Sequence, residues 1–190
     1  AAFWFSNALG GLFYNVRNAQ SLAEDVNSLG HCYLRLGQTQ KTETMWVKAY
    51  DDAQQHGQIR QIAEFAYNLA HVRTRQGRWE DALQLYNIAG QNARQDENMG
   101  LLGEVLFVMA RLRGRQGQIS QAIQEIEHSL QLIELVRKGH VRQAQAFIYA
   151  GDIYRYNSDI ERARGYYEEA DQLLKKLGGW YDWQAQASAS

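Results

Sequence analysis

The stretch AYNLAHVRTRQGRWEDALQLYNIA, residues 66–89, decides the fold, because two helical runs flank a short polar turn in it. The first run ends just before Gly77, and a glycine in that place is typical of the left-handed residue that terminates a helix. In the second run Ala82, Tyr86 and Ala89 recur at the spacing of one helix face. The stretch therefore predicts a helix, a tight turn and a second, amphipathic helix.

The same pattern occurs four times along the chain. The segments that close a helical run with a turn begin at residues 29, 69, 109 and 150, so their spacings are 40, 40 and 41. A fixed period of this length is typical of proteins built from stacked repeat units.

The turn position is marked in every unit. Gly37, Gly77 and Gly117 occupy it in the first three units, and the fourth has Asn157 and Ser158 there. Because asparagine tolerates the left-handed conformation next best after glycine, we expect Asn157 to adopt it.

Small and large residues alternate at fixed positions of the units. The small positions are Gly30, Ala70, Ala110 and Gly151 in the first helix, and Thr42, Ala82, Ala122, Ala163, Ala49, Ala89, Ser129 and Ala170 in the second. The large position of the second helix holds Trp46, Tyr86, Ile126 and Tyr167. Such alternation lets helices pack at short distance, so we expect all of these residues to be buried.

Composition excludes several classes of protein. The 190 residues carry a formal net charge of −1, whereas dedicated nucleic-acid binders usually show a strong basic excess. The most apolar stretch, residues 1–14, is shorter than the roughly 20 residues that a bilayer requires, and it lacks the basic leader of a secretory signal. The single cysteine, Cys32, can form no internal disulfide, which is typical of a reducing compartment. We therefore expect a cytoplasmic protein that binds neither nucleic acid nor membrane.

The four units resemble the tetratricopeptide repeat (TPR) family, and the resemblance covers about residues 23–177. Residues 66–89 match it best, with the family's Leu-Ala pair at Leu69 and Ala70 and its turn glycine at Gly77. The period of the family is usually about 34 residues, so this chain has either longer helices or longer loops between units. In that respect it is similar to the longer-repeat branch found in kinesin light chains, peptide-sensing bacterial regulators and sensor arms of signal-transduction ATPases.

The resemblance implies an all-α fold, a right-handed superhelical solenoid of TPR-like helix-turn-helix repeats. We expect a single array over residues 1–190. Its parts are a partial or capping repeat at 1–20, repeats at 23–62, 63–102, 103–143 and 144–177, and an aromatic cap with a polar tail at 178–190.

The two ends leave alternatives open. Ala1, Phe5 and Ala8 continue the register of the second helices backwards, so the chain is interpreted either as a fragment of a longer array or as starting with a capping helix. Near the other end, Trp180 and Trp183 belong to an aromatic cluster that either folds back onto the last helix or docks onto a neighbouring domain.

The resemblance also implies a function. In TPR arrays the first helices of the units line a concave side that commonly takes a peptide, so a protein- or peptide-binding scaffold is predicted. The implied peptide-binding residues are Asn27, His31, Arg35, Tyr67, Asn68, His71, Arg75, Phe107, Arg111, Arg115, Tyr149, Asp152 and Tyr156. No lysine lies at these positions, so the family's clamp for a C-terminal carboxylate is not expected.

Two charged positions recur on the first helices. Arginine stands near the end of three of them, at Arg35, Arg75 and Arg115, and glutamate near the start, at Glu24, Glu64 and Glu104. The pattern predicts a groove with a basic and an acidic edge. Forked guanidinium groups favour carboxylates and phosphates, so the predicted partner is an acidic or phosphorylated protein or peptide. The alternative is that both rows face water or pair across repeats, where each pair contributes little.

No motif for catalysis is present. The sequence has no phosphate-binding glycine loop, no HExxH helix and no serine elbow. His31 and His71 share a repeat position, but a structural zinc site needs about four ligands, so the two histidines are interpreted as groove lining. Carboxylates such as Glu168 and Glu169 are interpreted as solvated charge. We expect no enzymatic activity, no cofactor and no metal.

A second interpretation remains beside the scaffold. The array could be a regulatory sensor or autoinhibitory arm of a larger signalling ATPase or transcriptional regulator, restraining a neighbouring domain of a longer parent chain. The half-unit at the start of the sequence favours this alternative.

Overall fold

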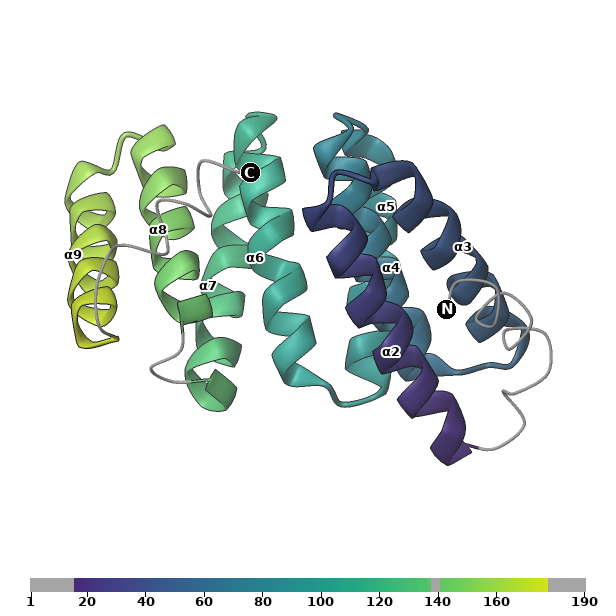
Figure 1. Ribbon diagram of the computed structural model, residues 1–190. Helices are drawn as coiled ribbons and strands as arrows, with labels where there is room; N and C mark the ends of the chain where they lie inside the picture. The colour runs from purple at the N-terminus through teal and green to yellow at the C-terminus, as the bar shows by residue number, and fades with distance from the viewer. Residues whose placement is uncertain (1–15, 138–140, 178–190) are drawn as a thin grey trace. The chain divides into compact units, whose positions relative to one another are not determined.

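The computed structural model describes residues 16–137 and 141–177. These ranges contain the helices α2 (Val16–Arg35), α3 (Thr39–Gln55), α4 (Ile59–Arg75), α5 (Trp79–Gln95), α6 (Met99–Arg115), α7 (Ile119–Arg137), α8 (Val141–Tyr156) and α9 (Ile160–Lys176) (Figure 1). Within the described ranges there is no strand, and the predicted all-α class is confirmed.

The 40-residue period is built from two half-units of 20 residues. The helices from α3 to α7 begin at residues 39, 59, 79, 99 and 119. The four helices from α3 to α6 have 17 residues each, and the turns after them, such as residues 56–58 and 76–78, have the same length. Because the connections between units are as short as those within units, long helices rather than long loops account for the period.

The three-residue turns share one pattern of hydrogen bonds. After α2, the Gln38 N–H donates to the Tyr33 carbonyl at 2.9 Å and the Gly37 N–H donates to the Leu34 carbonyl at 3.0 Å. This pair of bonds is the Schellman motif, which needs a residue with positive φ just after the helix. Gly37, Gly77 and Gly117 have φ values of 72°, 74° and 78°, so their predicted role as helix terminators is confirmed.

Two turns place a residue other than glycine in the left-handed conformation. Glu97 has a φ of 55° and Ser158 a φ of 62°. The expectation that Asn157 would adopt this conformation was therefore wrong by one residue. The reason is the Schellman pattern, which this turn shares: the Ser158 N–H donates to the Arg155 carbonyl at 3.1 Å and the Asp159 N–H to the Tyr154 carbonyl at 2.9 Å, so the second residue after α8 takes the positive φ.

The helices divide into two compact units, with the boundary between residues 92 and 93, near the end of α5. In the first unit, α2, α3 and α4 pack around a core that includes Trp46, Phe65 and Leu69. In the second unit, α6 packs on α7, α7 on α8 and α8 on α9. Figure 1 shows the last four helices side by side in this order.

The small and large positions fit each other directly. A Cβ atom added to Gly30 would lie 2.3 Å from the indole ring of Trp46, and one added to Gly151 would lie 2.5 Å from the ring of Tyr167. The glycines therefore leave room for a large ring of the following helix. Tyr167 departs from the expectation of burial, because it is only half-buried and its hydroxyl donates to Asp152 at 2.7 Å.

Some expectations concern residues outside the described ranges. Ala1, Phe5 and Ala8 lie there, as do Trp180 and Trp183 with the rest of the aromatic cluster. Among the described helices, none is long and apolar enough to cross a bilayer.

Candidate functional site

Three polar residues of α2 and α4, all on the predicted groove, meet in one hydrogen-bonded group. The Asn27 side-chain amide donates to the Glu64 carboxylate at 3.1 Å, and the Asn68 amide donates to the Asn27 side-chain oxygen at 2.8 Å. Glu64 and Asn68 lie one turn apart on α4, so they share a face of that helix. The group therefore joins the predicted faces of α2 and α4 into one polar surface, and Asn68 within it is only 6% exposed.

The predicted histidines pack against the large aromatic residue of their own repeat. The ring of His31 stands edge-on to Trp46, with centroids 5.3 Å apart. His71 packs edge-on against Tyr67 at 4.7 Å and against Tyr86 at 5.7 Å. Among the described residues, no three His, Cys, Asp or Glu side chains are grouped so that they could hold a metal ion.

The arginines of the repeated position stand at helix ends. Arg35 closes α2, Arg75 closes α4 and Arg115 closes α6, and all three are exposed. The helix dipole favours a cation in the last turn of a helix, so it accounts for arginine at this position without any ligand. Arg35 and Arg75 belong to the first unit and Arg115 to the second.

Two glutamates of the other repeated position do not form the predicted open acidic edge. Glu64 accepts from Asn27, as described above. Glu104 is only 7% exposed, and its carboxylate lies 3.8 Å from the guanidinium group of Arg142 on α8. Both glutamates are therefore paired across repeats, which is the alternative that the sequence left open.

In the second unit the predicted residues of α6 and α8 also meet. Phe107 is 2% exposed and packs against the Tyr149 ring at 5.6 Å between centroids. Arg111 donates to the Tyr149 hydroxyl at 3.1 Å, and its guanidinium group lies 4.7 Å from the centroid of that ring. Asp152 accepts from Tyr167, whereas Tyr156 is 50% exposed. Phe107 thus forms the floor of this surface and Arg111 is held by Tyr149.

A different surface of the second unit is hollowed. Two adjoining hollows of about 380 and 430 Å³ lie where α7, α8 and α9 meet. We call them together the α7–α9 hollow. Both are lined by Glu127, Tyr166 and Glu169; the first adds Tyr154, Arg162 and Gly165, and the second adds Leu130, Gln131, Glu134, Gln143 and Phe147.

This hollow lies on the other side of α8 from the predicted site. Gln143, Phe147 and Tyr154 line it, and they follow one face of α8 at intervals of four and seven residues. The predicted residues Tyr149 and Asp152 point away from that face, because each residue of a helix turns the side chain by about 100°. The two surfaces are therefore separate.

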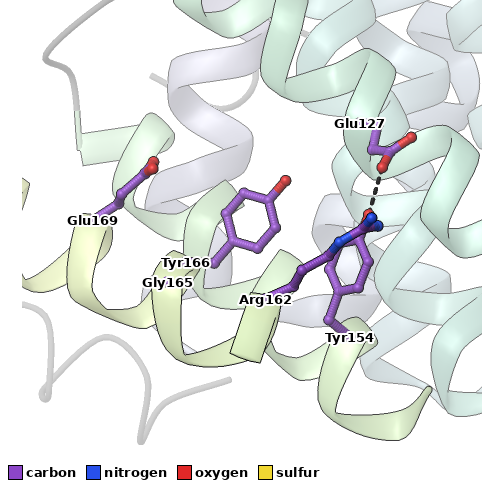
Figure 2. A pocket seen from close by; sticks show the side chains of 6 residues that line it. All are labelled: Glu127, Tyr154, Arg162, Gly165, Tyr166 and Glu169. Atoms are coloured by element: carbon purple, nitrogen blue, oxygen red, sulfur yellow. Dashed lines mark hydrogen bonds between the residues drawn. The ribbon is translucent and has the colours of Figure 1, made fainter. Parts of the chain in front are cut away.

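The first hollow has an ordered aromatic corner, drawn in Figure 2. The Tyr154 hydroxyl donates to the Glu127 carboxylate, and the rings of Tyr154 and Tyr166 lie 5.5 Å apart with planes 22° from parallel. The guanidinium group of Arg162 lies across the Tyr154 ring, 5.4 Å from its centroid. A cation over a tyrosine face is an attractive arrangement.

The phenols of this corner keep their protons. Burial, and then the hydrogen bond to Glu127, raises the pKa of Tyr154 to about 12. Burial also raises the pKa of Tyr166, and the negative charges of Glu127 and Glu169 raise it further, against a smaller lowering by the positive charge of Arg162. The hollow therefore has a negative electrostatic character around the Tyr166 hydroxyl.

None of the residues predicted to bind a ligand lines this hollow. Glu169 was interpreted only as solvated charge, and Phe147 and Tyr166 were not considered. A signal was present, since Phe147 and Tyr154 are aromatic residues seven apart on one helix face that differs from the predicted one.

Comparison with known proteins gives likeness in structure alone. No protein-family model matches the sequence, and no curated protein matches it at a significant level. The structure of BtubC (BKLC) from P. vanneervenii is similar with a TM-score of 0.76, at 18% identity, over 95% of this chain and 74% of that one. Aspartyl phosphate phosphatase F from Bacillus subtilis has a TM-score of 0.73, at 18% identity, over 93% of this chain and 46% of that one.

A third similar structure carries the repeat in its description. It is the crystal structure of the nearly identical TPR-like repeats of a putative kinesin light chain from Podosopora anserina, with a TM-score of 0.64 at 14% identity, over 93% of this chain and 86% of that one. Identities this low establish the fold and leave function to separate argument. The chain therefore has the fold of the tetratricopeptide-like helical repeat proteins.

Proposed function

We propose that the chain is a protein-binding scaffold whose first unit takes an acidic peptide across α2 and α4. The observation that carries this proposal is the hydrogen-bonded group of Asn27, Glu64 and Asn68, which joins two successive first helices into one polar surface. Binding usually costs free energy because side chains lose conformational freedom. Here the hydrogen bonds already restrict these three side chains in the free protein, so less freedom is lost on binding.

Two arginines on the same two helices favour an acidic ligand, and the one carboxylate within the group, that of Glu64, already accepts a hydrogen bond from Asn27. Arg35 and Arg75 are exposed at the ends of the same two helices. Guanidinium groups form paired hydrogen bonds with carboxylates and phosphates, and such charge-assisted bonds are the strong ones. The His31 and His71 rings, each fixed against an aromatic neighbour, add weaker polar contacts.

The test is a titration of the full chain with acidic peptides that carry glutamate or phosphoserine at alternating positions. We expect the double substitution Arg35→Glu with Arg75→Glu to weaken binding by about tenfold or more, because a hydrogen bond to a charged group contributes about 1.5–3 kcal/mol. Binding should also weaken as salt rises.

A matched control separates this surface from general charge effects. Arg94 on α5 and Arg164 on α9 are exposed arginines on second helices of their repeats. The double substitution Arg94→Glu with Arg164→Glu changes the net charge by the same amount. Equal weakening in both double variants would show that the peptide recognises net charge and not the surface of α2 and α4.

The regulatory arm remains the second candidate. The likeness to aspartyl phosphate phosphatase F is consistent with it, but at 18% identity that likeness concerns the fold. No feature of the described residues favours this candidate over the scaffold.

A further inference from the structure

The α7–α9 hollow contains two pairs of a tyrosine and a carboxylate; the first pair is hydrogen-bonded, and the second only lines the same hollow. The first corner consists of Tyr154 and Glu127, and the chain's own Arg162 places its guanidinium group over the tyrosine ring. The second corner consists of Tyr166 and Glu169, which line the same hollow. Figure 2 shows Arg162 at the first corner and Glu169 on the far side of Tyr166.

No cation from the described part of the chain is bonded to the second corner, although the charge of Arg162 acts on Tyr166 from the same hollow. Over residues 16–137 and 141–177, the Tyr166 hydroxyl and the Glu169 carboxylate make no hydrogen bond or ion pair. The ring of Tyr166 is held by stacking, at 5.5 Å from Tyr154 and 6.2 Å from Phe147. Aromatic packing therefore orders this corner, and no residue of the described ranges is bonded to its hydroxyl and carboxylate groups.

The charge of the hollow selects the ligand. The described residues that line it include three carboxylates, those of Glu127, Glu134 and Glu169, and one cation, Arg162. The negative charges of Glu127 and Glu169 are felt at the Tyr166 hydroxyl, whose pKa burial and these carboxylates raise. An anionic ligand would be repelled here, whereas a cation would gain from both carboxylates.

We propose that the α7–α9 hollow binds an arginine side chain of a basic protein segment at the corner formed by Tyr166 and Glu169. The first corner is the precedent, because there the guanidinium group of Arg162 lies over the Tyr154 ring while it is paired with a carboxylate, that of Asp159, at 3.4 Å. A planar guanidinium group suits it, since it stacks on aromatic rings and forms paired bonds to a carboxylate.

The dimensions fit a segment of a protein. Each hollow has a volume of several hundred cubic ångströms, about 380 and 430 Å³, which is within the range of small ligand sites. Because the two hollows share Glu127, Tyr166 and Glu169, the residues next to the bound arginine would lie in the second hollow, beside Phe147 and Gln143.

This site is independent of the proposed function. It lies on the other face of α8 from the predicted peptide-binding residues, and it takes a ligand of the opposite charge. Failure of one proposal therefore leaves the other standing.

The experiment uses the full chain and an acetylated, amidated peptide of alternating glycine and arginine. We expect the peptide to shift the backbone amide resonances of Gly165, Tyr166 and Glu169 most strongly in NMR spectra. The substitution Glu169→Lys should weaken binding by about tenfold, because the new ammonium group would lie at the same corner and repel the guanidinium group of the peptide.

The matched control is Glu168→Lys. Glu168 is the neighbouring residue of α9, its carboxylate lies 3.6 Å from Arg164 and it does not line the hollow. This variant carries the same charge change and should alter the affinity by less than about twofold. Circular dichroism spectra of both variants should match the parent chain.

Three results would overturn the proposal. One is equal weakening by Glu168→Lys and Glu169→Lys, which would indicate diffuse charge attraction. Another is a peptide-induced shift pattern that omits α9. The third is equal binding of a glycine-glutamate peptide of the same length.

Discussion

At the scale of single residues, the sign of φ determines where each helix ends. The Cβ positions of Gly37, Gly77 and Gly117 meet no atom within 4 Å, so the requirement for glycine there comes from the backbone alone. Glu97 and Ser158 occupy the same conformation with a side chain present. For an L-residue other than glycine this conformation is strained.

Exchanging residues at this turn position should therefore have opposite effects on stability. Gly77→Ala should lower the free energy of unfolding by about 1 kcal/mol, whereas Glu97→Gly should raise it by a few tenths up to about 1 kcal/mol. Urea denaturation of both variants measures the two changes. A loss of stability in Glu97→Gly would mean that the glutamate side chain contributes more than its strained backbone costs.

Tyr154 gives a prediction for alkaline pH. Its pKa in the folded protein is raised to about 12, chiefly by burial, so the folded state holds this proton more tightly than the unfolded state does. The resulting stabilisation is fully present below about pH 10, the pKa of an unperturbed tyrosine, and is lost as pH rises through the folded value.

Absorbance titration of tyrosinate measures this directly. We expect Tyr154→Phe to remove one late-titrating phenol from the curve and to leave the earlier part unchanged. A Tyr156→Phe variant is the control, because Tyr156 is 50% exposed. Loss of an early-titrating group in Tyr154→Phe would contradict the assignment.

At the scale of helices, one position of the first helix of each repeat holds either an arginine or a tyrosine, and both residue types bond to a carboxylate of a neighbouring helix. Arg73 on α4 donates to Glu43 on α3, and Arg113 on α6 donates to Glu125 on α7 at 2.8 Å. The fourth repeat has Tyr154 at this position, with its hydroxyl donating to Glu127. Arg73 and Tyr154 thus bond to a carboxylate on the second helix of the preceding repeat, whereas Arg113 bonds to one on the second helix of its own repeat.

The pairing of glycine with a large ring predicts a compensating double substitution. Gly30→Ala should destabilise the chain by about 1–3 kcal/mol, because its Cβ would overlap the Trp46 indole. The second repeat combines Ala70 with Tyr86 at these positions, so Gly30→Ala with Trp46→Tyr should recover part of the loss. Thermal melting of the single and double variants provides the measurement, and additive losses would mean that the two positions do not compensate.

At the scale of the whole molecule, stability is distributed over two compact units. In repeat proteins each repeat contacts only its neighbours, so the stability of one region depends mostly on local interactions. Gly30 and its contact Trp46 both belong to the first unit.

Hydrogen exchange should reveal this local character. In Gly30→Ala we expect amide protection to fall in α2, α3 and α4, while protection in α7, α8 and α9 stays near that of the parent chain. Gly151→Ala, which meets Tyr167 in the second unit, should show the reverse distribution. Equal loss of protection along the whole chain would show that the two units unfold together.

The period, the turns and the buried positions follow from the sequence itself. Glycine spacing fixed the helix ends at Gly37, Gly77 and Gly117 because positive φ is a local property of the backbone. Trp46 and Tyr86 could be recognised as buried because residues on one helix face share one neighbour. Local signals of this kind need no knowledge of the partner helix.

The candidate sites depend on contacts that only the tertiary structure provides. Repeat register placed Asn27 and Asn68 on one predicted surface, but it could not show that Glu104 is paired with Arg142. The aromatic face of Phe147 and Tyr154 is visible in the sequence, but the α7–α9 hollow itself is not, because Glu127, Tyr154 and Glu169 come from three helices. Whether a carboxylate is solvated or faces an aromatic ring depends on how those helices pack. Sequence thus determined the repeat, since its causes are local, and packing decided which polar groups remain open to a ligand, since burial and pairing are properties of neighbours distant along the chain.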